Sequence, residues 1–309
     1  MKITKKTPFS AVKVVVTGGA GFIGSNLTDA LVEKGFSVHV IDNLSEGKRE
    51  NVNKKAKLHV GDICDSKILK KVFKDAQYVF HLAALPRVQY SIEHPQETNE
   101  VNVGGTINVL EACRVTGVKK LIYSASSAAY GDQVKMPLVE SMSAVPKSPY
   151  GLQKYVGELY CKTWSEVYGL STVSLRYFNA YGPRQSEEGA YALVIARFLK
   201  QHREGKNVTI TGDGKQTRDF THVRDIVQAN ILAMESSKVG RGEVVNIGSG
   251  QNISVNEIAE LIGGPSEHVP ARLEPKHTLA DNSRARKLLG WKPTVNIEDG
   301  IRELLETEK

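Results

Sequence analysis

The sequence has few cysteines and no long apolar segment. Its three cysteines, Cys64, Cys113 and Cys161, stand far apart, so we expect reduced thiols rather than a disulfide framework. The eight histidines show no HxxxH or related ligand spacing, and no metal site is predicted. No window reaches the roughly 20 apolar residues of a membrane span, and the basic start MKITKKTPFS lacks the apolar stretch of a signal peptide. We therefore expect a soluble, cytoplasmic protein without a membrane partner.

The charge pattern does not indicate a nucleic-acid-binding protein. The 309 residues carry 41 Lys and Arg against 34 Asp and Glu, which gives a net charge of +7. This excess favours anionic partners, but the sequence has no aromatic-interleaved basic stripe, zinc-finger spacing or recognition-helix signature. The densest basic run, residues 47–57, also holds Glu50 and two Asn, and we interpret it as a solvated loop. No nucleic-acid partner is predicted.

Short apolar runs alternate with helical patterns from Val12 onward. Residues 12–16, VKVVV, form a β-branched run typical of a strand buried on both faces of a parallel sheet. Further strands are predicted at 37–42, 57–62, 78–84, 119–126 and 171–177, and helices at 27–35, 68–75, 98–116 and from Tyr150. This alternation is typical of right-handed βαβ units in a doubly wound α/β sheet. We predict a Rossmann domain in residues 1–176, with helices on both faces of its parallel sheet.

The pattern is looser in residues 177–309. Helices are predicted at 192–201, 226–236, 255–262, 283–290 and 297–307, and strands at 207–214 and 244–250. We expect a smaller, mixed substrate lobe, interleaved with the first domain and set against the carboxyl ends of the sheet strands.

The turn after the first strand, TGGAGFIGSN, is rich in glycine. Gly18, Gly21 and Gly24 are spaced so that backbone N–H groups can approach a pyrophosphate at the positive end of the next helix. Three glycines could also form an ordinary tight turn. However, Asp42 follows about 20 residues later, at the end of the second strand, where it would bind a ribose diol. Because an aspartate there repels a 2′-phosphate, NAD is favoured over NADP as the cofactor.

Two other strand ends suit the same ligand. Asp62 closes the third strand at the height of the adenine. The small residues of 82–84, at the end of the fourth strand, would pass under the cofactor, although plain packing explains them equally well.

The fifth strand ends in SASS, residues 124–127, and buried serines need hydrogen-bond partners. Turn chemistry could supply those partners. Alternatively, Ser126 or Ser127 would hold a substrate oxygen and pass a proton.

Tyr150 and Lys154 lie one helical turn apart in SPYGLQKYVGE. One interpretation is an amphipathic helix start with a buried ring and a solvated lysine. A free tyrosine has a pKa of about 10, and ionising it near neutral pH requires a shift of roughly 4 kcal/mol. The lysine ammonium, a serine hydrogen bond and a positive nicotinamide ring would each favour the phenolate. In this sequence context we predict that Tyr150 is a general base, and that Lys154 tunes it and holds the nicotinamide ribose.

These segments together resemble the extended short-chain dehydrogenase/reductase family. The similarity extends from Val12 to Trp291 and includes LRYFNAYGPRQ, GDGKQTRDFTHVRDI and LADNSRARKLLGW, which resemble segments of its nucleotide-sugar enzymes. Within this group the chain resembles the UDP-hexose 4-epimerases most, especially those acting on N-acetylhexosamines, which share a GAYALVIARF-like segment. The resemblance implies NAD contacts at Gly18, Gly21, Phe22, Ile23, Gly24, Asp42, Asn43, Gly47, Asp62, Ile63, Leu82, Ala83, Ala84, Asn102, Ser124, Tyr150, Lys154 and Tyr177.

The resemblance also implies a catalytic set and a UDP-sugar site. The implied catalytic residues are Ser126, Tyr150 and Lys154. The implied substrate contacts are Arg87, Ser126, Tyr150, Asn179, Val194, Thr209, Arg218, Arg272 and Thr278. Val194 and the strand 209–211 would line the uridine pocket, while Arg218 and Arg272 would clamp the diphosphate. The alternative role for each arginine is a surface salt bridge.

Two departures from related patterns narrow the expected reaction. The 4,6-dehydratases of this group carry an Asp-Glu pair where this chain has Ser127 and Ala128, and the nucleotide-sugar decarboxylases keep the glutamate. Thr278 stands where epimerases restricted to unmodified glucose and galactose have a bulky tyrosine, so it leaves room for an N-acetyl group. We therefore expect NAD-dependent inversion at C4 of UDP-GlcNAc/UDP-GalNAc, and also of UDP-Glc/UDP-Gal, through a 4-keto intermediate.

Two other functions stay open on the sequence alone. One is a different NAD-dependent nucleotide-sugar epimerase or reductase, and the other is a non-catalytic NAD-sensing protein, which the absence of Tyr150 or Lys154 would favour. The family further implies a homodimer, in which the helix before Ser124 and the helix opened by Tyr150 form a four-helix bundle with their copies. Four apolar residues of the first helix suit burial there or against the chain's own sheet: Val103, Ile107, Leu110 and Ala112.

Overall fold

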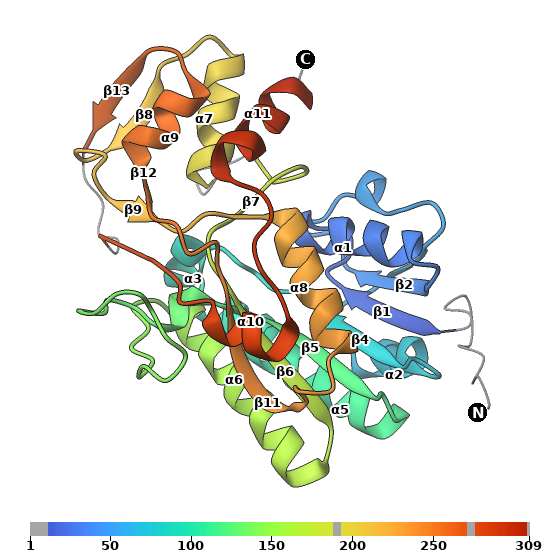
Figure 1. The fold of residues 1–309 in the computed structure, drawn as a ribbon. Coiled ribbons are helices and arrows are strands. Elements are labelled where there is room, and N and C mark those ends of the chain that lie inside the picture. The colour runs from blue at the N-terminus through green and yellow to red at the C-terminus, as the bar shows by residue number, and fades with distance from the viewer. Residues whose placement is uncertain (1–11, 188–192, 271–275, 308–309) are drawn as a thin grey trace, which may run out of the picture.

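The computed structural model describes residues 12–187, 193–270 and 276–307, and a seven-stranded parallel sheet forms the centre of this part of the chain. The strands lie in the order β11-β6-β5-β4-β1-β2-β3 (Figure 1). Their bounds are β1 Lys13–Thr17, β2 Ser37–Asp42, β3 Lys57–Val60, β4 Tyr78–His81, β5 Lys120–Ser126, β6 Ser171–Tyr177 and β11 Arg241–Ile247. The strand order reverses between β1 and β4, which is where open α/β sheets bind ligands.

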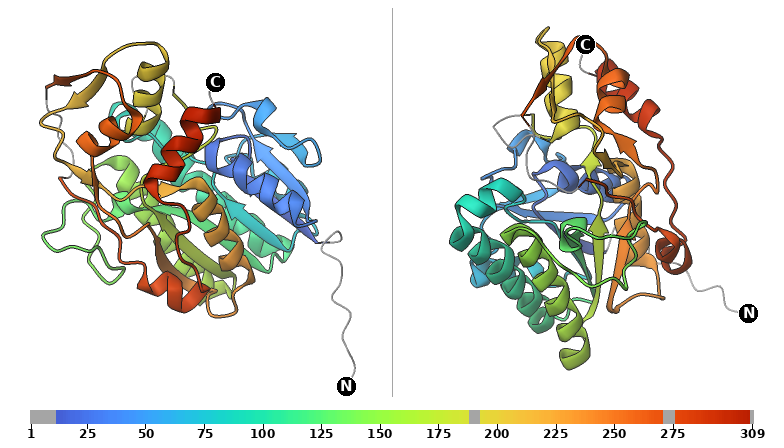
Figure 2. Two further views of the ribbon diagram at one scale, coloured as in Figure 1. Left: turned by 45° about the horizontal axis from the view of Figure 1, so that its top comes forward. Right: turned by 90° about the vertical axis from the view of Figure 1, so that its left-hand side faces the viewer.

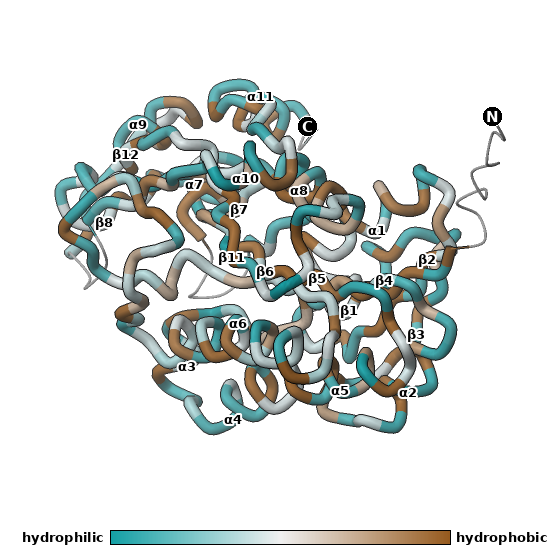
Figure 3. The backbone as a smooth tube through the Cα atoms, turned by 60° about the horizontal axis from the view of Figure 1, so that its bottom comes forward, coloured by the Kyte–Doolittle hydropathy of each residue, from teal (hydrophilic) through white to brown (hydrophobic). Residues whose placement is uncertain are grey.

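Helices cover both faces of this sheet (Figure 2). One face packs against α1 Phe22–Glu33, α8 Val223–Glu235 and α10 Ser283–Leu289, and the other against α2 Ser66–Phe73, α5 Thr106–Thr116 and α6 Pro149–Tyr168. Side chains of β1 alternate between the two cores, with Val14 and Val16 in the first and Val15 in the second. In Figure 3, hydrophobic and hydrophilic segments alternate along α5 and α6, as expected for helices with one buried face. The predicted Rossmann-like, doubly wound fold is confirmed.

A smaller lobe stands over the carboxyl ends of the strands (Figure 1). Its helices are α7 Val194–Arg203, α9 Val255–Ile262 and α11 Ile297–Thr307 within the described residues. Short paired strands complete it: β7 Ala180–Tyr181 with β10 Thr221–His222, β8 Val208–Thr211 with β13 Ser266–Val269, and β9 Thr217–Arg218 with β12 Ile253–Ser254. A separate apolar core, which includes Phe198, Ile258 and Ile301, holds these elements together.

Three elements beyond residue 177 return to the large sheet. β11 pairs in parallel with β6, and α8 and α10 share a core with α1. The sequence placed strand 244–250 in the lobe, but Val245 and Ile247 are buried in the Rossmann core, as expected for a strand covered on both faces. The two parts are thus interleaved along the chain, and the boundary between residues 176 and 177 stays a prediction.

The predicted helix 98–116 is not continuous. α4 Pro95–Asn99 leads into a π-helical turn, η3 Glu100–Gly105, and α5 continues from there. Such wide turns occur frequently at functional sites. Shorter elements were not predicted: α3 Val88–Glu93 and the 3₁₀ turns η2 Arg49–Asn51 and η4 Ser127–Ala129.

The described residues contain no helix that is long and apolar enough to cross a membrane. Within the same ranges, no three His, Cys, Asp or Glu side chains gather in a group that could hold a metal ion. Cys113 and Cys161 are buried free thiols, and Cys64 is half-buried.

Candidate active site

A continuous cavity of about 1660 Å³ runs along the carboxyl ends of the central strands and under the smaller lobe. Its volume exceeds the roughly 300–1,000 Å³ of a pocket for one drug-sized ligand, so it has room for a dinucleotide and a second ligand. Every predicted cofactor residue except Asn102 lines this cavity, and so does every predicted substrate residue except Thr209 and Arg272. Arg272 lies outside the residues that the structure describes.

The glycine-rich turn between β1 and α1 leaves space where an anion would bind. Gly18 has a φ of 70°, and a Cβ on Gly24 would lie 2.1 Å from Gly18 O, so the turn itself requires both glycines. Gly21 differs, because a Cβ there would meet no protein atom closer than Gly18 O at 3.4 Å. Gly21 is the N-cap of α1, which no side chain caps among the described residues. This open helix end fits a pyrophosphate.

Two carboxylates stand at the ends of the next strands. Asp42 is buried, and its two oxygens accept backbone N–H groups at 2.9 and 2.8 Å. Asp62 accepts hydrogen bonds from Asn43 Nδ2 at 2.9 Å and from Cys64 N at 2.8 Å. Burial raises the pKa of Asp62, but these hydrogen bonds outweigh it and lower the pKa below its usual value. An acidic residue at the position of Asp42 suits a ribose diol, so the site fits NAD.

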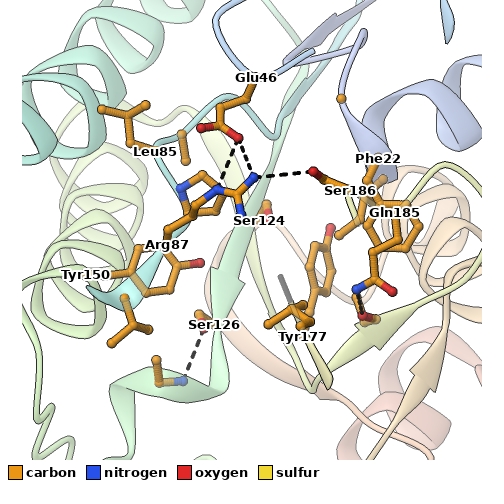
Figure 4. A pocket seen from close by; sticks show the side chains of 18 of the residues that line it. Phe22, Glu46, Leu85, Arg87, Ser124, Ser126, Tyr150, Tyr177, Gln185 and Ser186 are labelled. Atoms are coloured by element: carbon orange, nitrogen blue, oxygen red, sulfur yellow. Dashed lines mark hydrogen bonds and ion pairs between the residues drawn. The ribbon is translucent and has the colours of Figure 1, made fainter. Parts of the chain in front are cut away.

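Tyr150 lies in the first turn of α6. Ser148 caps this helix by accepting a hydrogen bond from Gly151 N at 3.1 Å, and Pro149 occupies its first position. The phenol hydrogen-bonds with Ser126 at the end of β5, and Figure 4 shows both on one side of the cavity, across from Tyr177. Burial raises the pKa of Tyr150 to about 12, although the bond with Ser126 lowers it. In the protein alone, Tyr150 is therefore neutral at physiological pH.

Lys154 is held by the end of β5. Its Nζ donates to Ser124 O at 2.8 Å and lies 5.1 Å from the centre of the Tyr123 ring. Burial lowers the pKa of Lys154 to about 8. The sequence predicted that this ammonium would favour the phenolate of Tyr150, but Lys154 is not among the groups that shift the pKa of Tyr150. The ammonium is held by a backbone carbonyl, and its effect on Tyr150 in the NAD-loaded site stays a prediction.

Three predicted substrate residues form one wall at the other end of the cavity. Asn179, with a φ of 25°, donates from Nδ2 to Asp219 O at 3.0 Å and to Thr278 Oγ1 at 3.3 Å. Arg218 is almost fully buried, and its Nη1 donates to Thr217 O at 2.9 Å. Asp219, which was not predicted, fixes this wall. Its carboxylate accepts hydrogen bonds from three backbone N–H groups, those of Ser249, Gly250 and Ala280.

Two predicted residues do not reach the cavity. Thr209 donates from its backbone N to Gln201 Oε1 at 3.0 Å and is covered by α7, whereas Thr211 at the end of β8 lines the cavity. The Asn102 amide is bonded to the backbone of Leu85 and to a side chain of α6. Direct contacts of Thr209 with uridine and of Asn102 with the cofactor are therefore not supported.

Arg87 joins three loops that line the cavity. Its Nε and Nη2 donate to Glu46 Oε2 at 3.2 and 2.9 Å, and its Nη2 lies 3.5 Å from Ser186 Oγ (Figure 4). Glu46 and Ser186 also line the cavity, and sequence analysis missed both. The only feature that Glu46 and Ser186 share in the sequence is that each lies in a loop after a strand. The three loops come together only in the folded chain, so the sequence does not indicate that these residues line one cavity.

Residues 14–248 match the NAD dependent epimerase/dehydratase family. The putative UDP-glucose 4-epimerase of Methanocaldococcus jannaschii is 39% identical over an alignment of 305 positions, which covers 96% of this chain and 98% of that protein. The structure of a Thermotoga maritima UDP-glucose 4-epimerase with UDP-glucose has a TM-score of 0.91 at 40% identity, covering 96% of this chain and 98% of that one.

A second structure extends this range of relatives. The UDP-N-acetylglucosamine 4-epimerase of Methanobrevibacter ruminantium, in complex with UDP-N-acetylmuramic acid, has a TM-score of 0.91 at 41% identity. The match covers 96% of this chain and 97% of that one. The resemblance found in the sequence is thus confirmed. The chain belongs to the NAD dependent epimerase/dehydratase family and is an NAD-dependent enzyme related to the UDP-sugar 4-epimerases.

Proposed function

We propose that the chain is a UDP-hexose 4-epimerase that interconverts UDP-GlcNAc and UDP-GalNAc and also accepts UDP-Glc and UDP-Gal. The observation that carries this proposal is a single cavity shared by two sites. It joins the glycine-rich turn and the pair Ser126 and Tyr150 to a wall that contains Asn179, Arg218 and Thr278. A dinucleotide and a nucleotide sugar bound in this cavity would meet at Tyr150.

The side chains around Tyr150 are suited to reversible proton transfer. NAD, held along the glycine-rich turn and by Lys154, would supply reversible hydride transfer at C4 of the sugar. Tyr150 takes the proton of the 4-hydroxyl, directly or through Ser126, and gives it back in the second half of the reaction. Ser126 Oγ accepts a hydrogen bond from Ala128 N at 3.2 Å, which holds the hydroxyl beside the phenol. Lys154, held by Ser124 O, would bind the nicotinamide ribose.

The 4-keto sugar has to turn over between the two halves of the reaction. Binding energy should therefore come from UDP, with the hexose held loosely. Arg218 offers a guanidinium whose geometry suits a diphosphate, and Val194 and Thr211 line the part of the cavity assigned to uridine. Ser127 and Ala128 line the cavity near Tyr150 and carry no carboxylate, so the acid–base pair of a dehydratase is missing from this position.

The small side chain of Thr278 supports an acetylated substrate, because it leaves room for an N-acetyl group in the cavity. Its hydroxyl accepts hydrogen bonds from Asn179 Nδ2 at 3.3 Å and from Asp219 N at 3.4 Å, so it is held within the wall. We expect kcat/KM for the UDP-GlcNAc pair to equal or exceed that for the UDP-Glc pair. Thr278→Tyr should lower the value for the acetylated pair by about tenfold or more, while the other pair changes little. A strong preference of the unaltered protein for unacetylated sugars would refute this assignment.

Tyr150→Phe separates an enzyme from an NAD-sensing protein. The variant keeps the ring but loses the proton carrier, so epimerisation should fall by a factor of about 100 or more. NAD binding should persist, because the glycine-rich turn is unchanged. Equal inactivity of the unaltered protein and the variant on a panel of UDP-sugars, with NAD still bound, would support sensing instead.

A second copy of the chain is the partner that we propose. Leu152, Leu159 and Val167 on α6 are 51%, 47% and 64% exposed, and they are spaced along one side of the helix. On the neighbouring helix α5, Val115 is 47% exposed. A run of exposed apolar residues along two adjacent helices marks an interaction surface. Pairing α5 and α6 with their copies would bury it.

The helix residues predicted for this interface divide into two groups. Leu110 and Ala112 are buried in the chain's own core, whereas Val103 and Ile107 are half-buried and remain available. Leu159→Glu should convert a dimer to a monomer in size-exclusion chromatography with light scattering. Leu261→Glu, at a 36% exposed leucine on α9, is the matched control and should leave the mass unchanged. A dimer that survives Leu159→Glu would place the interface elsewhere.

A further inference from the structure

Gln153 lies on α6 between Tyr150 and Lys154, yet it does not line the cavity. Its side chain is buried, with 4% of the residue exposed. Its Oε1 accepts a hydrogen bond from Asn102 Nδ2 at 2.8 Å, and its Nε2 donates to Thr98 Oγ1 at 3.0 Å. The amide therefore points away from the ligands and toward the helical segment that contains the π-helical turn.

Asn102 connects Gln153 to the loop after β4. Its Oδ1 accepts Leu85 N at 2.8 Å, and its Nδ2 donates to Leu85 O at 3.1 Å. With the bond to Gln153, both Nδ2 hydrogens and the Oδ1 atom of this amide are engaged. If the Asn102 amide were flipped, its Nδ2 donor would face the Leu85 N donor, and its Oδ1 acceptor would face the Leu85 O acceptor. The bond to Gln153 Oε1 therefore reinforces the orientation that Leu85 already favours. Leu85 directly follows residues 82–84, which line the cofactor half of the cavity.

The π-helical turn places Asn102 where it can reach both neighbours. η3 spans Glu100–Gly105, and the hydroxyl of Thr106 donates to Asn102 O at 2.6 Å. The same hydroxyl lies 3.0 Å from His81 Nε2 at the end of β4. The turn is thus tied to β4 and to the loop that follows it, while Gln153 ties it to the catalytic helix.

We propose that Gln153 is a positioning residue, which acts through Asn102 to keep the cofactor loop in register with Tyr150 and Lys154. Breaking the link leaves α6 folded and lets the 82–85 segment move relative to it. Bound NAD then loses contacts along that segment and leaves faster. The proposal rests on the NAD site of the proposed epimerase, but it does not depend on which sugar the enzyme accepts.

Gln153→Met and Gln153→Glu distinguish this role from general stability. Methionine has a similar length but makes neither hydrogen bond, and it leaves the Asn102 donor buried without a partner. We expect NAD release from the purified holoenzyme, followed by chromatography of the free nucleotide, to become about tenfold faster. Glutamate keeps the acceptor for Asn102, so Gln153→Glu should release NAD within about threefold of the unaltered rate. The KM for the UDP-sugar should not change in either variant.

Two further variants make the test decisive. Ile258→Val, in the core of the smaller lobe, is a control for modest destabilisation and should leave NAD release unchanged. Asn102→Asp keeps the acceptor for Leu85 N but removes the donors to Gln153 and to Leu85 O. It should release NAD at least as fast as Gln153→Met, and combining the two changes should add nothing to the effect of Asn102→Asp. Unchanged NAD release from Gln153→Met, or additive effects in the double variant, would overturn the proposal. Since release is measured without sugar, this result is independent of the epimerase assay.

Discussion

Reduction of the bound nicotinamide should raise the pKa of Tyr150 in the holoenzyme. In the protein alone, burial raises this pKa to about 12, and the Ser126 hydrogen bond is the influence that lowers it. Lys154 donates to Ser124 O and is not among the groups that shift it. The positive ring of oxidised NAD is therefore the charge that we expect to favour the phenolate, and a reduced, neutral ring should not do so.

The expected size of this effect follows from Coulomb's law. A unit charge about 4 Å from the phenol, at an effective dielectric constant of about 20, contributes about 4 kcal/mol. Such an energy lowers a pKa by about three. Tyr150 should therefore titrate near pH ~9 with oxidised NAD and near its value of about 12 with the reduced form. The rate of epimerisation should then rise with pH across the neutral range.

Ultraviolet absorbance of tyrosinate measures this titration directly. The chain has 11 tyrosines, so the signal of Tyr150 is obtained by subtracting the titration of Tyr150→Phe in the same cofactor state. The oxidised and reduced holoenzymes are compared at one salt concentration. The same pKa in both states would refute the reasoning, because the cofactor charge would then not reach the phenol.

Three other predictions concern the fold around the site. Gly21→Ala should leave the melting temperature unchanged but weaken NAD binding by about tenfold or more. Gly24→Ala should instead lower the free energy of unfolding by about 2 kcal/mol or more, because its Cβ would lie 2.1 Å from a carbonyl of the same turn. The pKa of His81 is lowered by burial to about 3. As the pH falls, the unfolded chain therefore binds a proton at this histidine at a higher pH than the folded chain does. Stability should fall by about 4 kcal/mol as pH drops from 6.5 toward 3, and His81→Asn should flatten this slope in urea titrations. Glu158→Gln removes the carboxylate bonded to buried Arg176 at 2.7 and 2.8 Å, and urea unfolding should show a loss of about 3–5 kcal/mol; a loss below 1 kcal/mol would contradict a tightly coupled pair.

The cofactor half of the fold was predictable because its signals are local. The run 12–16 is apolar and β-branched, as a strand covered on both faces must be. The turn after this strand needs glycine, because side chains at Gly18 and Gly24 would collide with backbone atoms. The spacing of the glycines in the sequence already indicates such a turn. Asp42 follows at the distance that a βαβ unit imposes. These features predicted the ligand class, whereas most of the predicted cofactor and substrate contacts came from the resemblance to a known family.

The remaining features depend on contacts between distant segments. The strand 244–250 was predicted as a strand, but nothing local indicates that it pairs with β6 rather than with a strand of the lobe. Thr209 has the alternation of a cavity-lining residue, and its hydrogen bonds with Gln201 depend on how α7 docks. The surroundings of Tyr150 also depend on distant segments. Helical spacing places Lys154 near it, but the ammonium is held by the carbonyl of Ser124, which lies on β5.

Inversion at C4 can be followed most directly by nuclear magnetic resonance in deuterated water. The purified protein, with no added cofactor, is incubated with UDP-GlcNAc, and the C4 position of the sugar is examined over time. We expect UDP-GalNAc to form with protium retained at C4, because the hydride leaves and returns within one active site. Deuterium at C4, or no inversion of any UDP-hexose tested, would contradict a hydride-transferring 4-epimerase.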